Sequence, residues 1–226
     1  MRNLFGKLIV TCTLTAAMFV VAGKVQAGQV FATSYDMPNG NTGSFNYWDK
    51  HYGGGVHTTD GEPLSGGLGD LTDGVVTNLN WNVVENTSPP GEGPYVGWLD
   101  IDPTITFHFA AVTAFDTVSI HFDDADGFGG VSAPSGVVID GTLFPVIDPA
   151  GTAPFWVTFD VSGLSATNTL TITLNRNNAW VFADEFQFAT PGTVPEPSSL
   201  ALLGLGGLGL AIGAFRTRPR VGGVRD

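Results

Sequence analysis

The chain has 226 residues and carries 21 Asp and Glu against nine Lys and Arg, so its formal net charge is −12 at pH 7. An acidic surface repels phosphate backbones, and this balance therefore argues against nucleic acid as a partner. The single cysteine, Cys12, excludes a fold held together by internal disulfide bonds.

The first predicted element is a secretory signal peptide over residues 1–27. Arg2 and Lys7 supply its positive start, and Leu8 to Ala22 form its apolar stretch. A small-residue cleavage site ends at Ala27. The only cysteine lies inside the apolar stretch, so we expect the exported part to depend on its core for stability.

Residues 28–190 form the predicted domain, and their number suits a single hydrophobic core. Lys50 and Arg176 are the only basic residues of this segment, against nineteen Asp and Glu, which makes its formal charge −17. Such a surface attracts divalent cations and favours solubility.

The domain is predicted to be all-β. Apolar residues alternate with polar ones in four segments, as Ile105, Phe107 and Phe109 do between threonines and a histidine. Trp98 and Trp180 are expected in the core. Eight or more short strands predict a two-sheet antiparallel sandwich, for which a jelly roll is the commonest closed arrangement. The predicted strands are 30–35, 75–84, 95–99, 104–109, 117–122, 137–146, 156–161, 169–174 and 181–188.

Three residues near strand ends form a candidate ligand site. Trp48 and His51 lie in the stretch 36–69, which is rich in Gly, Asn and Asp and is predicted to be mostly loop. Arg176 is the domain's only arginine and stands among asparagines. Exposed rings stack on sugars while Arg and Asn bond hydroxyl groups, so Trp48, His51 and Arg176 predict carbohydrate binding. Alternatively, the aromatic residues of 47–52 hold their own loop together.

An acidic run, Asp123-Asp124-Ala125-Asp126-Gly127, does not fit an EF-hand calcium loop. With Gly127 at loop position 6, Phe122 and Ala133 fall where oxygen ligands are required. The run is predicted to be an acidic loop after a strand, with loose cation binding as the alternative.

The residue types of the domain favour a protein that is not an enzyme. The sequence contains neither an HExxH nor a GxSxG motif. His108 and His121 lie on the polar faces of predicted strands, where they could face each other across a ladder. A solvated position is preferred to a zinc site for both. The many carboxylates leave a two-carboxylate glycosidase open by residue type, although the domain is small for one.

The last segment, residues 191–226, has three parts. Pro195-Glu196-Pro197 comes first, a span without charge follows over about 198–215, and the tail 216–226 is basic. Eighteen helical residues rise about 27 Å, close to the hydrocarbon thickness of about 30 Å. The basic tail predicts a cytoplasmic C-terminus.

This order of triplet, apolar span and basic tail resembles the PEP-CTERM sorting signal of bacterial exported proteins. The resemblance implies that a single transmembrane helix holds the protein in the inner membrane. An exosortase, a membrane-embedded cysteine peptidase, then processes the signal. The mature protein is expected at the cell surface or in the extracellular polysaccharide matrix.

Three short motifs carry a second resemblance, over about residues 69–188. Leu71-Thr72-Asp73-Gly74 comes early, Val96–Asp102 lies between, and Trp180–Phe188 is the last strand. The order is similar to the galactose-binding-like jelly roll of discoidin domains and many carbohydrate-binding modules. There an early loop and a Glu on the last strand approach a structural calcium ion. Carried over, the resemblance implies calcium ligands among Asp70, Thr72, Asp73 and Glu185; alternatively, the loop is an ordinary turn and Glu185 is solvated.

The sequence thus predicts an exported β-sandwich that binds carbohydrate without catalysis, with extracellular polysaccharide as a possible partner. A structural surface protein that acts by assembly is the alternative. A small hydrolase is the third interpretation and the least favoured.

Overall fold

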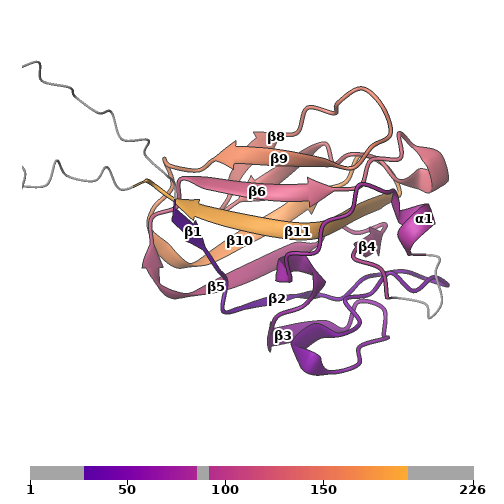
Figure 1. The fold of residues 1–226 in the computed structure, drawn as a ribbon, viewed down its shortest axis with the longest axis horizontal. Coiled ribbons are helices and arrows are strands. Elements are labelled where there is room, and N and C mark those ends of the chain that lie inside the picture. The colour runs from indigo at the N-terminus through magenta and orange to yellow at the C-terminus, as the bar shows by residue number, and fades with distance from the viewer. Residues whose placement is uncertain (1–27, 86–91, 193–226) are drawn as a thin grey trace, which may run out of the picture. The chain divides into compact units, whose positions relative to one another are not determined.

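In a computed structural model, the chain is described over residues 28–85 and 92–192. Eleven strands of this part form two antiparallel sheets (Figure 1). The first sheet contains β1 (Gly28–Val30), β4 (Val96–Leu99), β6 (Thr117–Phe122), β9 (Phe155–Asp160) and β11 (Trp180–Thr190). The second contains β2 (Ser34–Pro38), β3 (Pro63–Gly67), β5 (Thr104–Thr113), β7 (Gly136–Ile139), β8 (Thr142–Pro145) and β10 (Thr167–Asn175).

The strand order is β1-β11-β6-β9 in the first sheet, where β4 also pairs with β11, and β3-β2-β5-β10-β7-β8 in the second. The helical elements are short: η1 (Tyr52–Gly54), η2 (Asp70–Thr72), α1 (Trp81–Val84) and η3 (Phe128–Gly130). In Figure 1, β1 and the last residues of β11 lie at one end of the sheets, and α1 and β4 lie at the other. The prediction of an all-β, two-sheet antiparallel domain is confirmed, and the arrangement is consistent with a jelly roll.

The main core lies between the sheets. Phe107 of β5 contacts Phe186 and Phe188 of β11, with each pair of ring centroids 4.9 Å apart. The alternation that predicted these strands puts such residues on the inner face of each sheet. Trp98 belongs to this core and is fully buried, as predicted.

A second hydrophobic group lies against the first sheet. We call it the aromatic cluster, and its rings belong to Tyr47, Trp81, Tyr95, Trp180 and Phe182. Trp180 is buried in it, as predicted. Tyr47 is buried here as well, whereas Tyr52 is buried in the main core. Both tyrosines therefore hold the 47–52 segment against the domain.

Three strand predictions need correction. Residues 75–84 are not a strand: the amide of Thr77 donates to Asp184 at 3.2 Å instead of to a ladder, and the segment ends in α1. The predicted strand 30–35 is split between β1 and β2, which lie in different sheets. Residues 137–146 form a hairpin, because Asp140 and Gly141 both have positive φ, as a tight turn between strands requires.

Residues 36–69 are mostly loop, as predicted, and also contain the end of β2, β3 and η1. Two expectations about the histidines were wrong. His108 and His121 do not face each other, because β5 and β6 belong to different sheets. His108 bonds to Asp36. His121 is buried and bonds to Asp184, so the solvated position predicted for it is wrong.

Within 28–85 and 92–192, no helix is long and apolar enough to cross a membrane. The predicted signal peptide and the span 198–215 lie outside the described residues.

Candidate functional site

The residues predicted to bind calcium come together only in part. Thr72, Asp73 and Glu185 line one pocket of about 150 Å³ beside β1 and β11. The Gly74 amide donates to Glu185 Oε2 at 3.0 Å, so the early loop does meet the last strand. Asp70 does not line this pocket, and its amide donates to Asp49 Oδ1 at 3.2 Å.

The side chains of this pocket are of the types that bind a cation, but their arrangement is less suited to one. Thr72 Oγ1 is buried and has no hydrogen-bond partner among the described residues. Burial, together with Asp73 and Asp184, raises the pKa of Glu185 to about 7, although its bond from Gly74 opposes the shift. A hydroxyl and two carboxylates are the oxygen ligands that calcium takes. However, no group of three or more Asp, Glu, His or Cys in the described ranges converges as a metal cluster.

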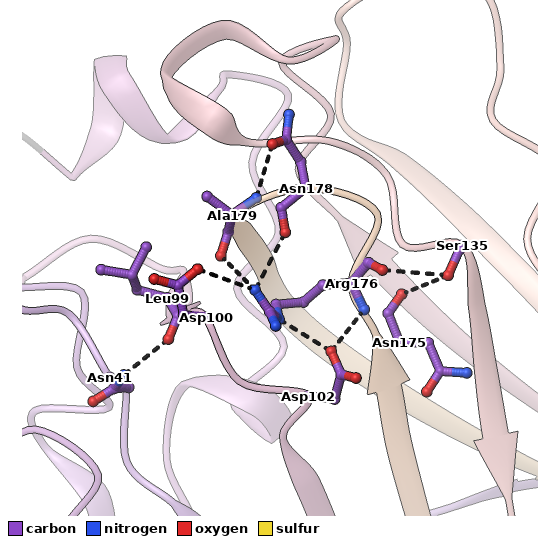
Figure 2. A network of polar contacts seen from close by, with 9 residues as sticks. All are labelled: Asn41, Leu99, Asp100, Asp102, Ser135, Asn175, Arg176, Asn178 and Ala179. Carbon is purple, nitrogen blue, oxygen red and sulfur yellow. Dashed lines mark hydrogen bonds and ion pairs between the residues drawn. The ribbon is translucent and has the colours of Figure 1, made fainter.

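Arg176 follows β10, in the turn that leads to β11. Figure 2 shows its guanidinium bonded to Asp100, Asp102 and two carbonyl groups. Arg176 Nε donates to Asp102 Oδ1 at 3.0 Å, and Nη1 lies 3.4 Å from Asp100 Oδ1. Nη1 also donates to the carbonyl oxygens of Asn178 and Ala179. These bonds join the β10–β11 turn to the β4–β5 turn, so Arg176 already has partners within the protein.

Trp48 and His51 are also bonded internally. Trp48 Nε1 donates to Asp60 Oδ1 at 2.9 Å, and His51 Nε2 lies 2.9 Å from Glu92 Oε2. Within the described ranges, no hydrogen bond, ion pair or ring contact joins Trp48, His51 and Arg176 to one another. The three residues share no direct contact in this part of the chain, and their role in binding a common ligand stays a prediction.

The aromatic cluster provides surface features that the sequence analysis missed. Phe45 is 49% exposed, yet its ring stacks on buried Tyr47 with centroids 5.4 Å apart and planes 11° apart. It also meets the Trp180 ring edge-on at 5.9 Å. Phe128, in the loop after β6, is 65% exposed. Both phenylalanines lie outside the alternating strand segments. That position was the signal available in the sequence, because an aromatic residue in a loop has no sheet face to fill.

Several carboxylates beneath the cluster are buried. Glu85 Oε1 accepts from the Tyr95 amide at 2.7 Å, and Asp123 Oδ2 accepts from the Trp81 amide at 3.1 Å. Glu85 Oε2 and Asp123 Oδ1 are buried without a hydrogen-bond partner in the described part of the chain. Burial, and then neighbouring carboxylates, raises the pKa of Glu85 to about 8 and that of Asp123 to about 7.

The acidic run at 123–127 is a loop after β6, as predicted, and its first two carboxylates lie inside the protein. Asp123 and Asp124 are fully buried, and Asp124 Oδ1 accepts from the amides of Asp126 and Ala133. Asp126 has positive φ, and Gly127 follows it in the same region. The run therefore shapes the loop after β6 by bonding to its backbone.

Comparison with known families gives two matches. Residues 32–132 match the DS-like domain of discoidin domain-containing receptor 1/2, and residues 193–218 match the PEP-CTERM protein-sorting motif. The chain carries a PEP-CTERM sorting motif and a discoidin-like domain. The second match contains Pro195, Glu196 and Pro197, which lie outside the described residues. Both resemblances drawn from the sequence are thereby confirmed.

The fold is also similar to solved structures, at low identity. A truncated AlyQ with CBM32 and alginate lyase domains is 12% identical, with 74% of this chain and 34% of that chain covered and a TM-score of 0.43. The CBM32 of AlyQ in complex with 4,5-unsaturated mannuronic acid is 16% identical, with 51% and 89% covered and a TM-score of 0.30. The GH31 CBM32-2 bound to GalNAc is 12% identical, with 69% and 96% covered and a TM-score of 0.33.

The chain spans about a third of the length of the first of these structures. Comparison with curated proteins gives no match.

Proposed function

We propose that the domain is a non-catalytic carbohydrate-binding module of an exported protein. The observation that carries the proposal is the Phe45 ring, which is half exposed and stacked on the buried Tyr47. Because Tyr47 holds one face of Phe45 in place, the ring loses little freedom when a sugar stacks on its outer side. The discoidin-like match of residues 32–132 includes both rings.

The absence of catalysis is part of this proposal. Inverting or retaining hydrolysis of a glycoside needs two carboxyl groups that reach the substrate. Glu85 and Asp123, two carboxyls with strongly raised pKa values, are buried and bonded to backbone amides, as is Asp184, which accepts from Thr77. These contacts favour structural roles for all three.

A bound structural calcium ion is the second part of this proposal. Thr72, Asp73 and Glu185 would hold it, with Asp70 nearby, and it would offset the negative charge that these carboxylates gather around β11. The discoidin-like match includes the loop that contains Thr72 and Asp73.

The last part of the proposal concerns how the protein is sorted to the cell surface. The PEP-CTERM motif at 193–218 implies that an exosortase-type membrane peptidase processes the chain after export. We infer that the protein is first anchored in the inner membrane by its C-terminal span and then reaches the cell surface or matrix. Mass spectrometry of the surface-released protein should find a C-terminus near residues 194–198. Recovery of protein that ends at Asp226 from the medium would contradict this route.

Binding of the full chain to an array of neutral and acidic glycans tests the central proposal. We expect binding to neutral glycans, which Phe45→Ala weakens about threefold to tenfold, the range of one aromatic contact. Phe31→Ala is the matched control, because Phe31 is 71% exposed and lies between β1 and β2. If the full chain binds no glycan, the structural-assembly alternative replaces this proposal.

A further inference from the structure

The loop that contains Phe128 has a well-defined conformation. Gly127, Gly129 and Gly130 all have positive φ, which glycine adopts without strain. The amide of Phe128 donates to the Ala125 carbonyl at 2.9 Å, and the Gly130 amide donates to Gly127 at 3.0 Å. The Gly127 amide closes the loop with a 2.8 Å bond to Val131. An ordered backbone thus presents a phenylalanine ring to solvent.

The loop is also fixed from below by the aromatic cluster. A Cβ atom at Gly129 would lie 2.6 Å from Trp81 Cζ2, so the glycine backbone rests directly on the indole. At Gly130 a Cβ atom would lie 3.4 Å from Trp180 Cδ1. Trp180 also contacts Phe45, so the two exposed phenylalanines flank one rigid support. A support of this kind reduces the entropy lost when a ligand binds.

A pocket of about 340 Å³ lies beside Phe128, and its other lining residues are Asn80, Asn82, Ala125 and Thr152. Asn80 Nδ2 donates to the carbonyl oxygens of Asp124 at 3.1 Å and Thr152 at 2.6 Å. These bonds use both amide hydrogens and hold the side chain in one orientation. Its Oδ1 is then the atom that can accept from a ligand hydroxyl group.

The charges around this pocket are all negative. Asp124 and Asp126 flank Ala125, and Asp148 is close to both, since after burial they are the main causes of its raised pKa. Lys50 and Arg176, the domain's only basic residues, pair with Glu92 and with Asp100 and Asp102. An anionic ligand would therefore meet repulsion without an opposing cation.

We propose that Phe128, Asn80 and the pocket between them form a second sugar subsite that selects a neutral pyranose ring. The apolar face of the sugar stacks on Phe128, and its hydroxyl groups bond to the Asn80 amide and the pocket edge. The inference rests on the proposed carbohydrate-binding function and adds a site separate from Phe45. It also states the selectivity: a uronic acid in the same position would bring its carboxylate close to Asp124, Asp126 and Asp148.

Isothermal titration of the full chain tests this subsite. The probes are dextran, galactomannan and arabinogalactan as neutral polymers, and alginate and polygalacturonate as acidic ones. We expect at least one neutral polymer to bind. Phe128→Ala should weaken that binding about threefold to tenfold, and Phe128→Tyr, which keeps the ring, should stay close to the unchanged chain. Phe31→Ala controls for the loss of an exposed ring elsewhere.

The outcomes separate the subsite from the wider function. If a neutral polymer binds and Phe128→Ala leaves its affinity unchanged while Phe45→Ala lowers it, the subsite is wrong and the carbohydrate-binding function stands. If only an acidic polymer binds, the selectivity argument fails and the subsite with it. If no polymer binds the unchanged chain, both proposals are overturned. Circular dichroism of each variant shows whether a loss of binding reflects a loss of fold.

Discussion

Side chains with hydrogen-bonding groups and phenylalanine side chains differ in what they contact in the loops of this protein. Trp48, His51 and Arg176 have the hydrogen-bonding groups expected of a ligand site, but each is bonded to a carboxylate of the protein itself. Phe45 and Phe128 have no such groups, and their rings are exposed. In a domain with a formal charge of −17, the donor groups of these three residues bond to internal carboxylates. We therefore propose that recognition depends on apolar rings and amides.

The largest expected effect concerns the buried carboxylates that support the aromatic cluster. The folded-state pKa values of Glu85 (about 8) and Asp123 (about 7) lie well above their ordinary values. Between about pH 4.5 and pH 8 the folded state therefore binds protons that the unfolded state does not, and stability falls as pH rises through this window. We expect a loss of a few kcal/mol in urea unfolding.

Glu85→Gln keeps an acceptor for the Tyr95 amide and removes one of the two titrating groups, so it should reduce the pH dependence and leave the contribution of Asp123. Glu62→Gln, which removes a more exposed carboxylate that pairs with His57, is the control. Stability that rises between pH 5 and pH 8 would contradict the assignment.

The next largest effect is that of calcium. A ligand that binds only the folded state stabilises it by about 2.7 kcal/mol at a hundredfold excess over its Kd. Calcium should therefore raise the Tm of the full chain, and Asp73→Ala or Glu185→Ala should remove the increase. The matched control is Asp160→Ala, an exposed carboxylate at the end of β9. Identical melting curves in calcium and in chelator would rule out the site.

The third prediction concerns the rings of Phe45 and Phe128 together. The double variant Phe45→Ala, Phe128→Ala should lose about 2 kcal/mol of binding free energy to a neutral polysaccharide, or roughly thirtyfold in affinity. Titration calorimetry measures this loss. Each single variant should contribute part of it, because each ring contacts the sugar separately. If the double variant binds the polysaccharide as tightly as Phe45→Ala alone does, then all of the stacking is on Phe45.

The smallest effect is expected at Arg176. Its partners Asp100 and Asp102 are largely exposed, and such pairs are worth about 1 kcal/mol or less. Arg176→Gln should lower the free energy of unfolding by about that amount and leave glycan affinity within twofold. A large loss of affinity at unchanged stability would restore Arg176 as a direct ligand contact.

The strands were predictable because alternation records which face of a sheet is buried. Ile105, Phe107 and Phe109 point inward from β5 as their spacing required. Residues 75–84 were misassigned because apolar content alone cannot show that the amide of Thr77 bonds to a carboxylate 107 residues away. Long-range bonds of this kind are specified by the assembled fold.

The candidate site was harder to predict for a related reason. The approach of Gly74 to Glu185 followed from a motif order that resembles known domains. The internal pairing of Arg176 depends on two turns that are distant in sequence. The sequence showed Phe128 only as an aromatic residue outside the strand segments, and the structure places it outside both hydrophobic groups, on a loop supported by Trp81.

The most direct test of the account is a heteronuclear NMR titration of the full chain with an oligosaccharide of a neutral polymer that binds. The account predicts that the amides of Phe45 and of Gly127 to Gly130 shift on titration, because the sugar stacks beside them. The amides of Gln29 and Phe31, which lie in and just after β1 at the opposite end of the sheets, should not move. Shifts confined to the β1 end, or centred on Arg176 with the two phenylalanine loops unchanged, would contradict it.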